Sequence, residues 1–318
     1  MAAKGIDISL TKQYLEADEL VAVPTETVYG LAGNALHAKA VAKIFEVKER
    51  PSFDPLIIHV PDAQQLERYV AKIPKQAEQL INHFWPGPLT LVLPKKDIIP
   101  DLVTAGLDSV GVRCPDHHLT HQLLRQLDFP LAAPSANPFG YVSPTTAAHV
   151  EEQLGSKIPY ILDGGPCKVG IESTIIGFEN DKPIIYRRGG ISNEAIERVI
   201  GPVDSRLHST SNPKAPGQLQ SHYAPRKPFL LGDIDQLLTA VKGKKVGILR
   251  YKESKNRAEN EIVLSPTENL AEAAQNLFAA LRQLDTMNID LIIAEKVPDI
   301  GIGKAINDRL TRAAAASR

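Results

Sequence analysis

Hydroxyl, amide and basic side chains occur at two places where a short apolar run gives way to a loop. In the stretch 21–60, Thr25-Glu26-Thr27 follows an apolar run, and Lys48 and Arg50 end a predicted helix. The stretch 132–145 has the same character. Hydroxyls and amides donate hydrogen bonds to oxyanions, Arg binds them in a bidentate manner, and Lys acts as a point charge. The combination predicts a pocket for a polar, phosphorylated ligand.

A structural explanation stays open for each group. The hydroxyls of Thr25 and Thr27 could cap a turn, and Lys48 with Arg50 could form a solvated basic helix end that suits the helix dipole. We favour a binding site because the chain turns directly from Arg50 into a buried run that ends at His59. The ends of such runs lie where open α/β sheets bind ligands.

Further polar groups follow other apolar runs. Ser135 and Asn137 come after the run 131–133, and Ser143 before Pro144 has the ordinary role of a helix N-cap, which is compatible with phosphate binding at a helix N-terminus. Three more predicted strand ends carry Arg or hydroxyl groups, at Arg113, Ser173 and Arg187-Arg188. In a chain without a general basic excess, these ends argue for convergence on one anion site.

Composition restricts the classes of protein. The 318 residues exceed the roughly 100–200 of a single domain and 43% are apolar, so we expect two globular domains. The net charge of −1 argues against a whole surface that binds nucleic acid or anionic membrane. Cys114 and Cys167 fit neither a disulfide framework nor a zinc pattern. With no signal-peptide core and no run of ~20 apolar residues, we expect a soluble, cytoplasmic protein.

The pattern of residues 1–203 predicts a catalytic α/β domain whose sheet has mixed strand direction. Short β-branched runs alternate with amphipathic stretches, and several runs are apolar throughout, as in strands covered on both faces. The expected strands are 21–23, 56–60, 89–93, 110–113, 131–133, 173–177 and 184–187. The expected helices are 38–48, 63–70, 75–84, 119–127, 145–154 and 193–200.

Residues 204–227 are expected to form a linker, because this proline-rich segment has few apolar residues and no periodicity. His222 and Tyr223 supply directional contacts that a passive tether does not need, so we expect the segment to dock. Residues 228–318 resume strand–helix alternation, which predicts a small doubly wound unit. Its expected strands are 229–233, 244–250 and 289–295, and its expected helices are 234–241, 270–284 and 304–315.

Several familiar motifs are absent from the sequence. It contains no GxxxxGK[ST] phosphate loop, no HExxH, no GxSxG and no CxxC pair. Gly301-Ile302-Gly303 lacks the third glycine of a dinucleotide fingerprint, so a helix-entry turn is the better interpretation. The second domain therefore gives no independent sign of a cofactor.

The ordered set of motifs resembles the YrdC-like family. The motifs that carry the resemblance are PTETVYGLAG (24–33), Lys48-x-Arg50, Ser135-x-Asn137 and RRGGIS (187–192). PGQLQSHYAP (216–225) and the C-terminal unit are similar to those of its two-domain members, the L-threonylcarbamoyladenylate synthases. The resemblance covers essentially the whole chain. It implies an open, twisted mixed sheet in the first domain and a Rossmann-like α/β fold in the second.

The resemblance also implies a reaction. L-Threonine, bicarbonate or CO2, and ATP would give threonylcarbamoyl-AMP, pyrophosphate and water. A separate tRNA threonylcarbamoyl-transferase complex would move the activated group to the adenosine beside the anticodon of tRNAs that read ANN codons, so tRNA would be an indirect partner. Mg²⁺ would ride on the triphosphate rather than in a protein cage, since it sheds water reluctantly.

Motif positions imply roles for individual residues. Threonine would be bound by Thr27, His59, Ser109, Arg113, Ala133 and Ser173. ATP would be bound by Lys48, Arg50, Asp54, Ser135, Ser143 and Arg187, and catalysis would rest on Lys48, Arg50, Ser135 and Asn137. Charge would develop on carbamate, α-phosphate and pyrophosphate, where preorganised cations and donors stabilise it without a protein nucleophile. If His222 and Tyr223 fold back over the pocket, they would exclude water from the labile product.

Two residues depart from the family pattern, and two other functions compete. Asp54 stands where Asn is common, so that it either orients Arg50 or binds magnesium, and Arg188 stands where Pro often follows the arginine.

Arg113 and Arg187, with the Lys-x-Arg pair, could instead hold double-stranded RNA in a salt-dependent way. A third possibility is O-carbamoylation from carbamoyl phosphate, although the acylphosphatase and zinc-finger appendages of such relatives are not visible in the sequence.

Overall fold

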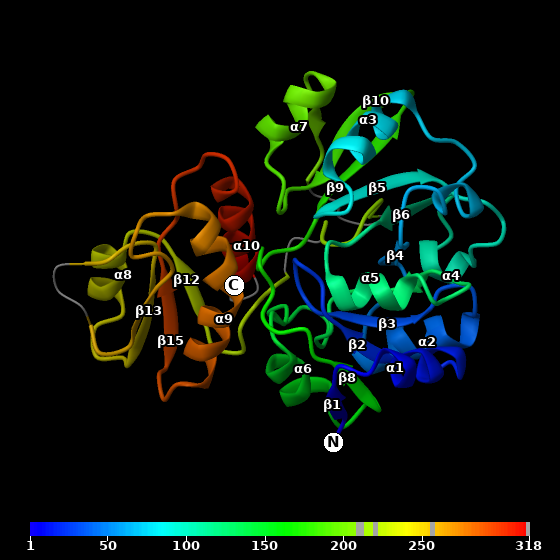
Figure 1. Ribbon diagram of the computed structural model, residues 1–318. Coiled ribbons are helices and arrows are strands. Elements are labelled where there is room, and N and C mark those ends of the chain that lie inside the picture. The colour runs from blue at the N-terminus through cyan, green and yellow to red at the C-terminus, as the bar shows by residue number, and fades with distance from the viewer. Residues whose placement is uncertain (208–212, 219–221, 255–257, 316–318) are drawn as a thin grey trace.

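Two β-sheets organise the computed structural model, which describes residues 1–207, 213–218, 222–254 and 258–315 (Figure 1). Of the predicted linker, residues 208–212 and 219–221 therefore lie outside the described residues. Within the described parts of the chain, eleven strands form a large mixed sheet and four form a small parallel sheet. Figure 1 shows the two sheets in two lobes that lie against each other.

The large sheet combines parallel and antiparallel pairs, which confirms the predicted mixed direction. Its strands follow one another in space as β1 (Ala3–Gly5), β8 (Tyr160–Leu162), β2 (Val21–Val23), β3 (Gly30–Asn34), β7 (Leu131–Ala132), β4 (Ile57–His59), β6 (Ser109–Arg113), β5 (Leu89–Pro94), β9 (Thr174–Glu179), β10 (Lys182–Arg187) and β11 (Asp204–Ser205). The helices of this lobe are α1 (Ile8–Glu16), α2 (Ala38–Lys48), α3 (Lys75–Phe84), α4 (Asp101–Thr104), α5 (His118–Leu124), α6 (Ala147–Leu154) and α7 (Asn193–Ile200).

The small sheet matches the predicted doubly wound unit. Its parallel strands lie in the order β12 (Phe229–Leu231), β15 (Leu291–Ala294), β13 (Val246–Arg250) and β14 (Glu261–Val263). Helices α8 (Ile234–Ala240), α9 (Leu270–Thr286) and α10 (Gly303–Ala315) belong to the same lobe, and α9 and α10 lie on the side that faces the large sheet (Figure 1). Among the described residues, no helix combines the length and the apolar character needed to span a bilayer.

Apolar side chains from both lobes form a continuous core where the lobes meet. Val28, Val142 and Ile171 of the large lobe pack in the same buried cluster as Leu277 and Phe278 of α9. Burial of apolar surface is the main favourable term in such a contact. The second lobe is therefore packed against the first rather than tethered beside it.

One predicted helix is wrong. Residues 63–70 form only a short 3₁₀ turn, η1 (Leu66–Arg68). The Asp62 carboxylate accepts a hydrogen bond from the backbone N–H of Gln65 at 3.0 Å, which favours a tight local turn. Val70 then makes an isolated antiparallel bridge with Lys95. The backbone of Val70 is thus paired with the segment around Lys95 and cannot extend a helix.

Gly170 lies where the backbone of the large lobe is in close contact with α9 of the second lobe. Its φ is +78°, and a Cβ atom there would lie 2.3 Å from the Cα of Gln275 in α9. Gly106 has a φ of +77° with nothing near its would-be Cβ, so Gly106→Ala should cost only the backbone strain of about 1–2 kcal/mol. Gly170→Ala should lower the free energy of unfolding by roughly 1–3 kcal/mol more, because α9 must move. Equal losses in urea unfolding would contradict this packing.

Candidate active site

A cavity of about 60 Å³ lies on one face of the large sheet, over its short central strands. Ile57 and His59 of β4 both line it, because alternate residues of a strand point to the same face. His59 pairs in register with Arg113 of β6, which also lines the cavity. The sequence placed the ligand at strand ends. The lining residues do lie at strand ends, because His59, Arg113 and Arg187 are the last residues of β4, β6 and β10. Ile57, at the start of β4, extends the lining along the sheet face.

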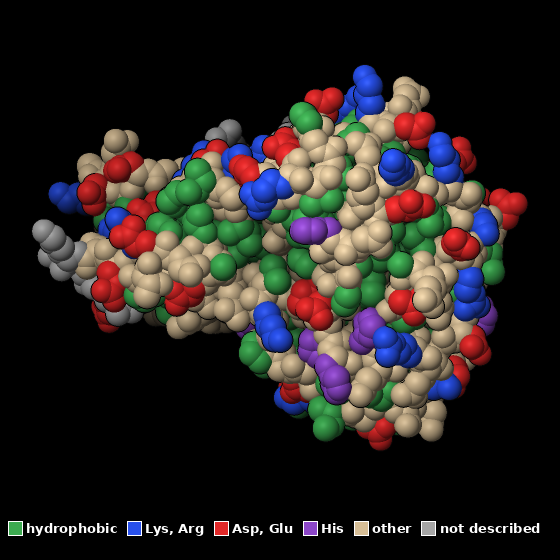
Figure 2. Space-filling view, turned by 45° about the horizontal axis from the view of Figure 1, so that its top comes forward, with side chains coloured by type: hydrophobic (Ala, Val, Ile, Leu, Met, Phe, Trp, Pro, Cys, Tyr) green, Lys and Arg blue, Asp and Glu red, His purple; other side chains and the backbone are tan. Residues whose placement is uncertain are grey.

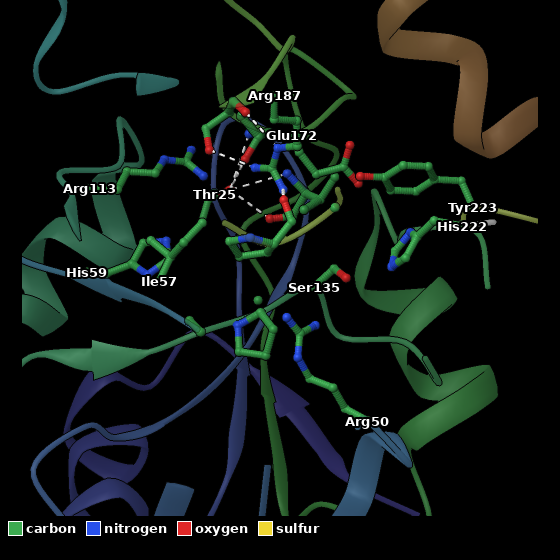
Figure 3. A pocket seen from close by; sticks show the side chains of 18 residues that line it. Thr25, Arg50, Ile57, His59, Arg113, Ser135, Glu172, Arg187, His222 and Tyr223 are labelled. Carbon is green, nitrogen blue, oxygen red and sulfur yellow. Dashed lines mark hydrogen bonds between the residues drawn. The ribbon is translucent and has the colours of Figure 1, made fainter. Parts of the chain in front are cut away.

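Three buried arginines meet at this cavity. Arg50 follows α2, Arg113 ends β6 and Arg187 ends β10, and Figure 3 shows their side chains approaching from different sides. All three are at most 9% exposed. Hydroxyl groups complete the polar lining, from Thr25, Thr27, Ser135 and Ser173. Guanidinium and hydroxyl donors around a small covered space form a site for oxyanions.

Arg113 and His59 form the side of the cavity near β4 and β6. Arg113 contacts the carboxylate of Glu26, with Nη2 2.7 Å from Oε1. Burial, and then the charge of Arg113, lower the pKa of His59 to about 3. His59 is therefore neutral near pH 7, and its Nδ1 has no hydrogen-bond partner among the described residues. A neutral imidazole beside a cation can donate to or accept from a zwitterionic ligand.

Arg187 and Ser173 are joined because β9 and β10 form an antiparallel pair. The Nε of Arg187 donates to the backbone oxygen of Ser173 at 3.0 Å, and its Nη2 donates to the Ser173 hydroxyl at 3.0 Å. Thr90 Oγ1 lies 2.8 Å from the same hydroxyl. Burial lowers the pKa of Arg187. Ser173 is thus held in place by two elements and cannot rotate freely.

Arg50 is oriented by the loop that follows it. Helix α2 ends at Lys48, and its C-cap residue Glu49 has a left-handed φ of 55°, which turns the chain away from the helix axis. Arg50 donates from Nε to the Asp54 backbone oxygen at 3.1 Å and from Nη2 to the Pro55 oxygen at 2.8 Å. The Asp54 carboxylate lies 2.9 Å from the same Nη2, and both side chains are buried. Of the two explanations for Asp54, this contact favours orientation of Arg50.

Lys48 and Asn137 do not line the cavity. Lys48 is 1% exposed, and its Nζ donates to the backbone oxygens of Ser135 at 2.6 Å and Asn137 at 2.5 Å. The Asn137 amide donates to the oxygens of Pro138 and Tyr141 at 2.8 and 2.9 Å. Burial, and then the charge of Arg50, lower the pKa of Lys48 well below its usual value. Both residues shape the loop that presents Ser135 to the cavity.

Two other serines are not where the sequence suggested. Thr146, not Ser143, caps α6, by accepting from the backbone N–H of His149. Ser143 is buried, and its hydroxyl donates to Glu172 Oε1 at 2.6 Å. Ser109 begins β6 while Arg113 ends it, which separates the two by roughly 13 Å at about 3.3 Å per residue. The structure thus removes Ser109 from the expected threonine set, whereas Ala133 lines the cavity.

The linker covers the cavity. Pro216, Gly217, His222 and Tyr223 all contribute to its lining, and Figure 3 shows His222 and Tyr223 opposite His59. Tyr223 is 1% exposed and stacks on Phe278 of α9 with ring centroids 5.7 Å apart. Burial, and then the charges of Arg50 and Lys48, lower the pKa of His222 well below its usual value. The predicted docking segment therefore closes the site as a neutral, largely apolar cover.

Sequence reasoning missed a contact from the second lobe. Arg309 of α10 is fully buried, its Nε donates to Glu172 Oε2 at 2.9 Å, and its guanidinium lies 5.0 Å from the centre of the Tyr223 ring. Glu172 lines the cavity. One available signal was the position of Arg309 between Ile306 and Leu310, on the apolar face of a predicted amphipathic helix. Such a buried arginine needs a carboxylate partner.

Arg309→Leu should remove the ion pair between the second lobe and the cavity lining. The change leaves the Glu172 carboxylate buried without its cation, so we expect the free energy of unfolding to fall by roughly 3–5 kcal/mol. Adding Glu172→Gln should recover part of the loss, because the two residues are coupled. Lys304→Leu breaks the more exposed pair with Glu194 and should cost less than about 1 kcal/mol. Additive effects in urea unfolding would refute the coupling.

The lining favours electrostatic chemistry. Cys114 and Cys167 are buried, and burial raises the pKa of each thiol to about 12, so neither is an activated nucleophile. Among the residues that the structure describes, no three His, Cys, Asp or Glu side chains converge on a metal position. The cavity instead offers cations and hydroxyls at fixed positions under a closed cover. That arrangement can bind anions, orient them and stabilise charge that develops on oxygen.

Two family models match adjoining parts of the chain. The sequence model of the Sua5/YciO/YrdC family, described as "Telomere recombination", matches residues 13–189. The model described as "Threonylcarbamoyl-AMP synthase, C-terminal domain" matches residues 191–315. The threonylcarbamoyl-AMP synthase of Bacillus subtilis is 44% identical over 313 residues, which cover 94% of this chain and 90% of the relative.

A relative of known structure covers both lobes. The threonylcarbamoyl-AMP synthase of Pyrococcus abyssi is 42% identical over 323 residues, which cover 96% of this chain and 93% of the relative. The crystal structure of P. abyssi Sua5 complexed with L-threonine superposes with a TM-score of 0.93 at 40% identity, covering 100% of this chain and 98% of that one. The chain therefore belongs to the Sua5/YciO/YrdC family, in the two-domain form that carries the threonylcarbamoyl-AMP synthase C-terminal domain.

Proposed function

We propose that this protein is a threonylcarbamoyl-AMP synthase, which converts L-threonine, bicarbonate and ATP into threonylcarbamoyl-AMP, pyrophosphate and water, or uses CO2 in place of bicarbonate without releasing water. The observation that carries the proposal is the cavity where Arg50, Arg113 and Arg187 face hydroxyl groups beneath the linker. Relatives with this name cover nearly the whole chain. Three buried guanidiniums suit a reaction in which ATP, threonylcarbamoyl-AMP and pyrophosphate are anions and threonine carries a carboxylate.

The cavity supports a division between the two larger substrates. His59 and Arg113, with Thr27 nearby, offer a neutral imidazole, a cation and a hydroxyl, which match the ammonium, carboxylate and hydroxyl of threonine. Arg50 and Ser135 lie on another side, toward the loop that Lys48 fixes. We assign that side, together with Arg187, to the phosphates of ATP.

The proposed reaction needs charge stabilisation more than proton transfer. The threonine amine adds to bicarbonate or CO2 to give a carbamate, whose oxygen then attacks the α-phosphorus of ATP and releases pyrophosphate. Negative charge grows on the phosphate oxygens, where Arg50 and Arg187 are held rigidly by backbone carbonyls. Such preorganised donors cost no reorganisation during the reaction. No general base is assigned.

Magnesium and the downstream partners belong to the proposal as well. Asp54 is committed to Arg50, so we propose that Mg²⁺ arrives on the phosphates of ATP and needs no protein cage. We also propose that a separate transferase complex takes the activated group to tRNA in the cytoplasm. A mixed anhydride of carbamate and phosphate hydrolyses readily, and a covered pocket protects it until transfer.

The synthase activity can be tested directly. We expect pyrophosphate and threonylcarbamoyl-AMP, detected by mass, only when ATP, threonine and bicarbonate are all present. Ser135→Ala should lower turnover roughly 10-fold or more by removing a donor from the cavity, and Lys48→Ala should do the same by releasing the Ser135 loop. Pyrophosphate release without threonine or bicarbonate, or none at all, would reject the function. Full activity in both variants would reject the site.

The linker should protect the product. Gly217 has a φ of +78°, and a Cβ there would lie 3.0 Å from the Tyr223 hydroxyl and 3.1 Å from Arg187 Cδ. Gly217→Ala should loosen the cover and lower the ratio of adenylate to pyrophosphate about threefold or more, because water enters. Gly201→Ala, at a φ of +81° with open space around it, is the matched control. An unchanged ratio in Gly217→Ala would show that the linker is no lid.

A further inference from the structure

Glu26 faces away from the cavity that its neighbours line. Thr25 and Thr27 line the cavity, whereas Glu26 lines a separate groove of about 630 Å³ on the outer side of the same segment. The groove runs between α5 and the chain around Pro166. The groove is about ten times the volume of the cavity.

One ion pair joins the lining of the groove to the lining of the cavity. Glu26 Oε1 lies 2.7 Å from Arg113 Nη2, and the two side chains are 4% and 6% exposed. Glu26 Oε2 accepts from the backbone N–H of Asp116 at 3.1 Å, which holds the carboxylate at the inner end of the groove. Arg113 Nε has no hydrogen-bond partner among the described residues. The guanidinium therefore has donor capacity left for an anion.

The rim of the groove favours a small anion. Arg125 and Lys168 are exposed on it and outnumber the exposed Asp116, while Glu26 at the inner end is neutralised by Arg113. Three histidines, His117, His118 and His121, also line the groove. Figure 2 shows histidine side chains gathered next to Lys or Arg side chains on this face of the large lobe. Cations around a concave surface raise the local concentration of anions.

We propose that this groove is the entrance for bicarbonate, which passes the Glu26–Arg113 pair while the linker covers the other side. The inference rests on the proposed function. The covered cavity, about 60 Å³, is far smaller than the roughly 300–1,000 Å³ of pockets that hold drug-sized ligands, so ATP requires the linker to withdraw. Bicarbonate is the smallest substrate and an anion. Past the rim cations, Arg113 is the cation that lines the cavity itself, and the Glu26–Arg113 pair is the contact that bicarbonate must displace.

The experiment blocks the groove by attaching a bulky group to a single introduced cysteine. Gln122 is exposed, lines the groove and carries no charge, so Gln122→Cys followed by a bulky maleimide fills it. The two native thiols are buried, with pKa values raised to about 12, and stay unmodified, which mass spectrometry verifies. Gln79→Cys, on the exposed face of α3, is the matched control. We expect the KM for bicarbonate to rise roughly 10-fold only in modified Gln122→Cys, with KM for ATP and threonine unchanged.

A second arm tests the charge of the rim. Arg125→Glu with Lys168→Glu should raise the KM for bicarbonate severalfold at low salt and less at high salt, because surface charges are screened. An unchanged KM after complete modification overturns the entrance, as does an equal rise for all three substrates. If modification raises the KM for bicarbonate but charge reversal leaves it unchanged, neutral CO2 is the species that enters. That result overturns the entrance for an anion. Failure of the unmodified protein to form the adenylate would instead reject the proposed function.

Discussion

Three guanidinium groups buried around one small cavity are the constraint on which the rest of the structure depends. A buried cation is costly unless hydrogen bonds or carboxylates compensate it. Arg113 has Glu26 and Arg50 has Asp54, at 2.7 and 2.9 Å. Arg187 has no ion pair with a carboxylate within the described parts of the chain, and it donates to both the backbone oxygen and the hydroxyl of Ser173. Each compensation fixes a loop, and together they hold the site in position before any ligand binds.

The second lobe also supplies a charge that balances a buried group of the cavity lining. Glu172 lines the cavity and is balanced by Arg309 of α10, which also lies over the ring of Tyr223. Tyr223 in turn stacks on Phe278 of α9. Tyr223 of the linker therefore lies between the cavity and the second lobe, in contact with the guanidinium of Arg309 and the ring of Phe278. The position of Tyr223 over the cavity thus depends on side chains of the C-terminal unit.

Much of the fold follows from local patterns. The helix at 38–48 and the apolar strand at 21–23 were predicted with their observed bounds, because periodicity and burial agree there. β3 was missed, since Gly30–Asn34 has two glycines and no β-branched residue. Ser143 resembles a helix cap in sequence, yet its hydroxyl is taken by Glu172, 29 residues away. Local sequence preference thus predicts many of the helices and strands, whereas the role of Ser143 depends on a partner distant in the sequence.

The sequence by itself determined which residue types follow the strands, the two-lobed α/β architecture and the family to which the chain belongs. It did not determine which of these side chains face the cavity. Lys48 and Arg50 are two residues apart, but Lys48 turns to the carbonyls of residues 135 and 137 while Arg50 lines the site. Arg309 reaches the cavity margin from the last helix. Only the tertiary structure decides the directions of Lys48 and Arg309, because each buried charge finds its partner more than eighty residues away in the chain.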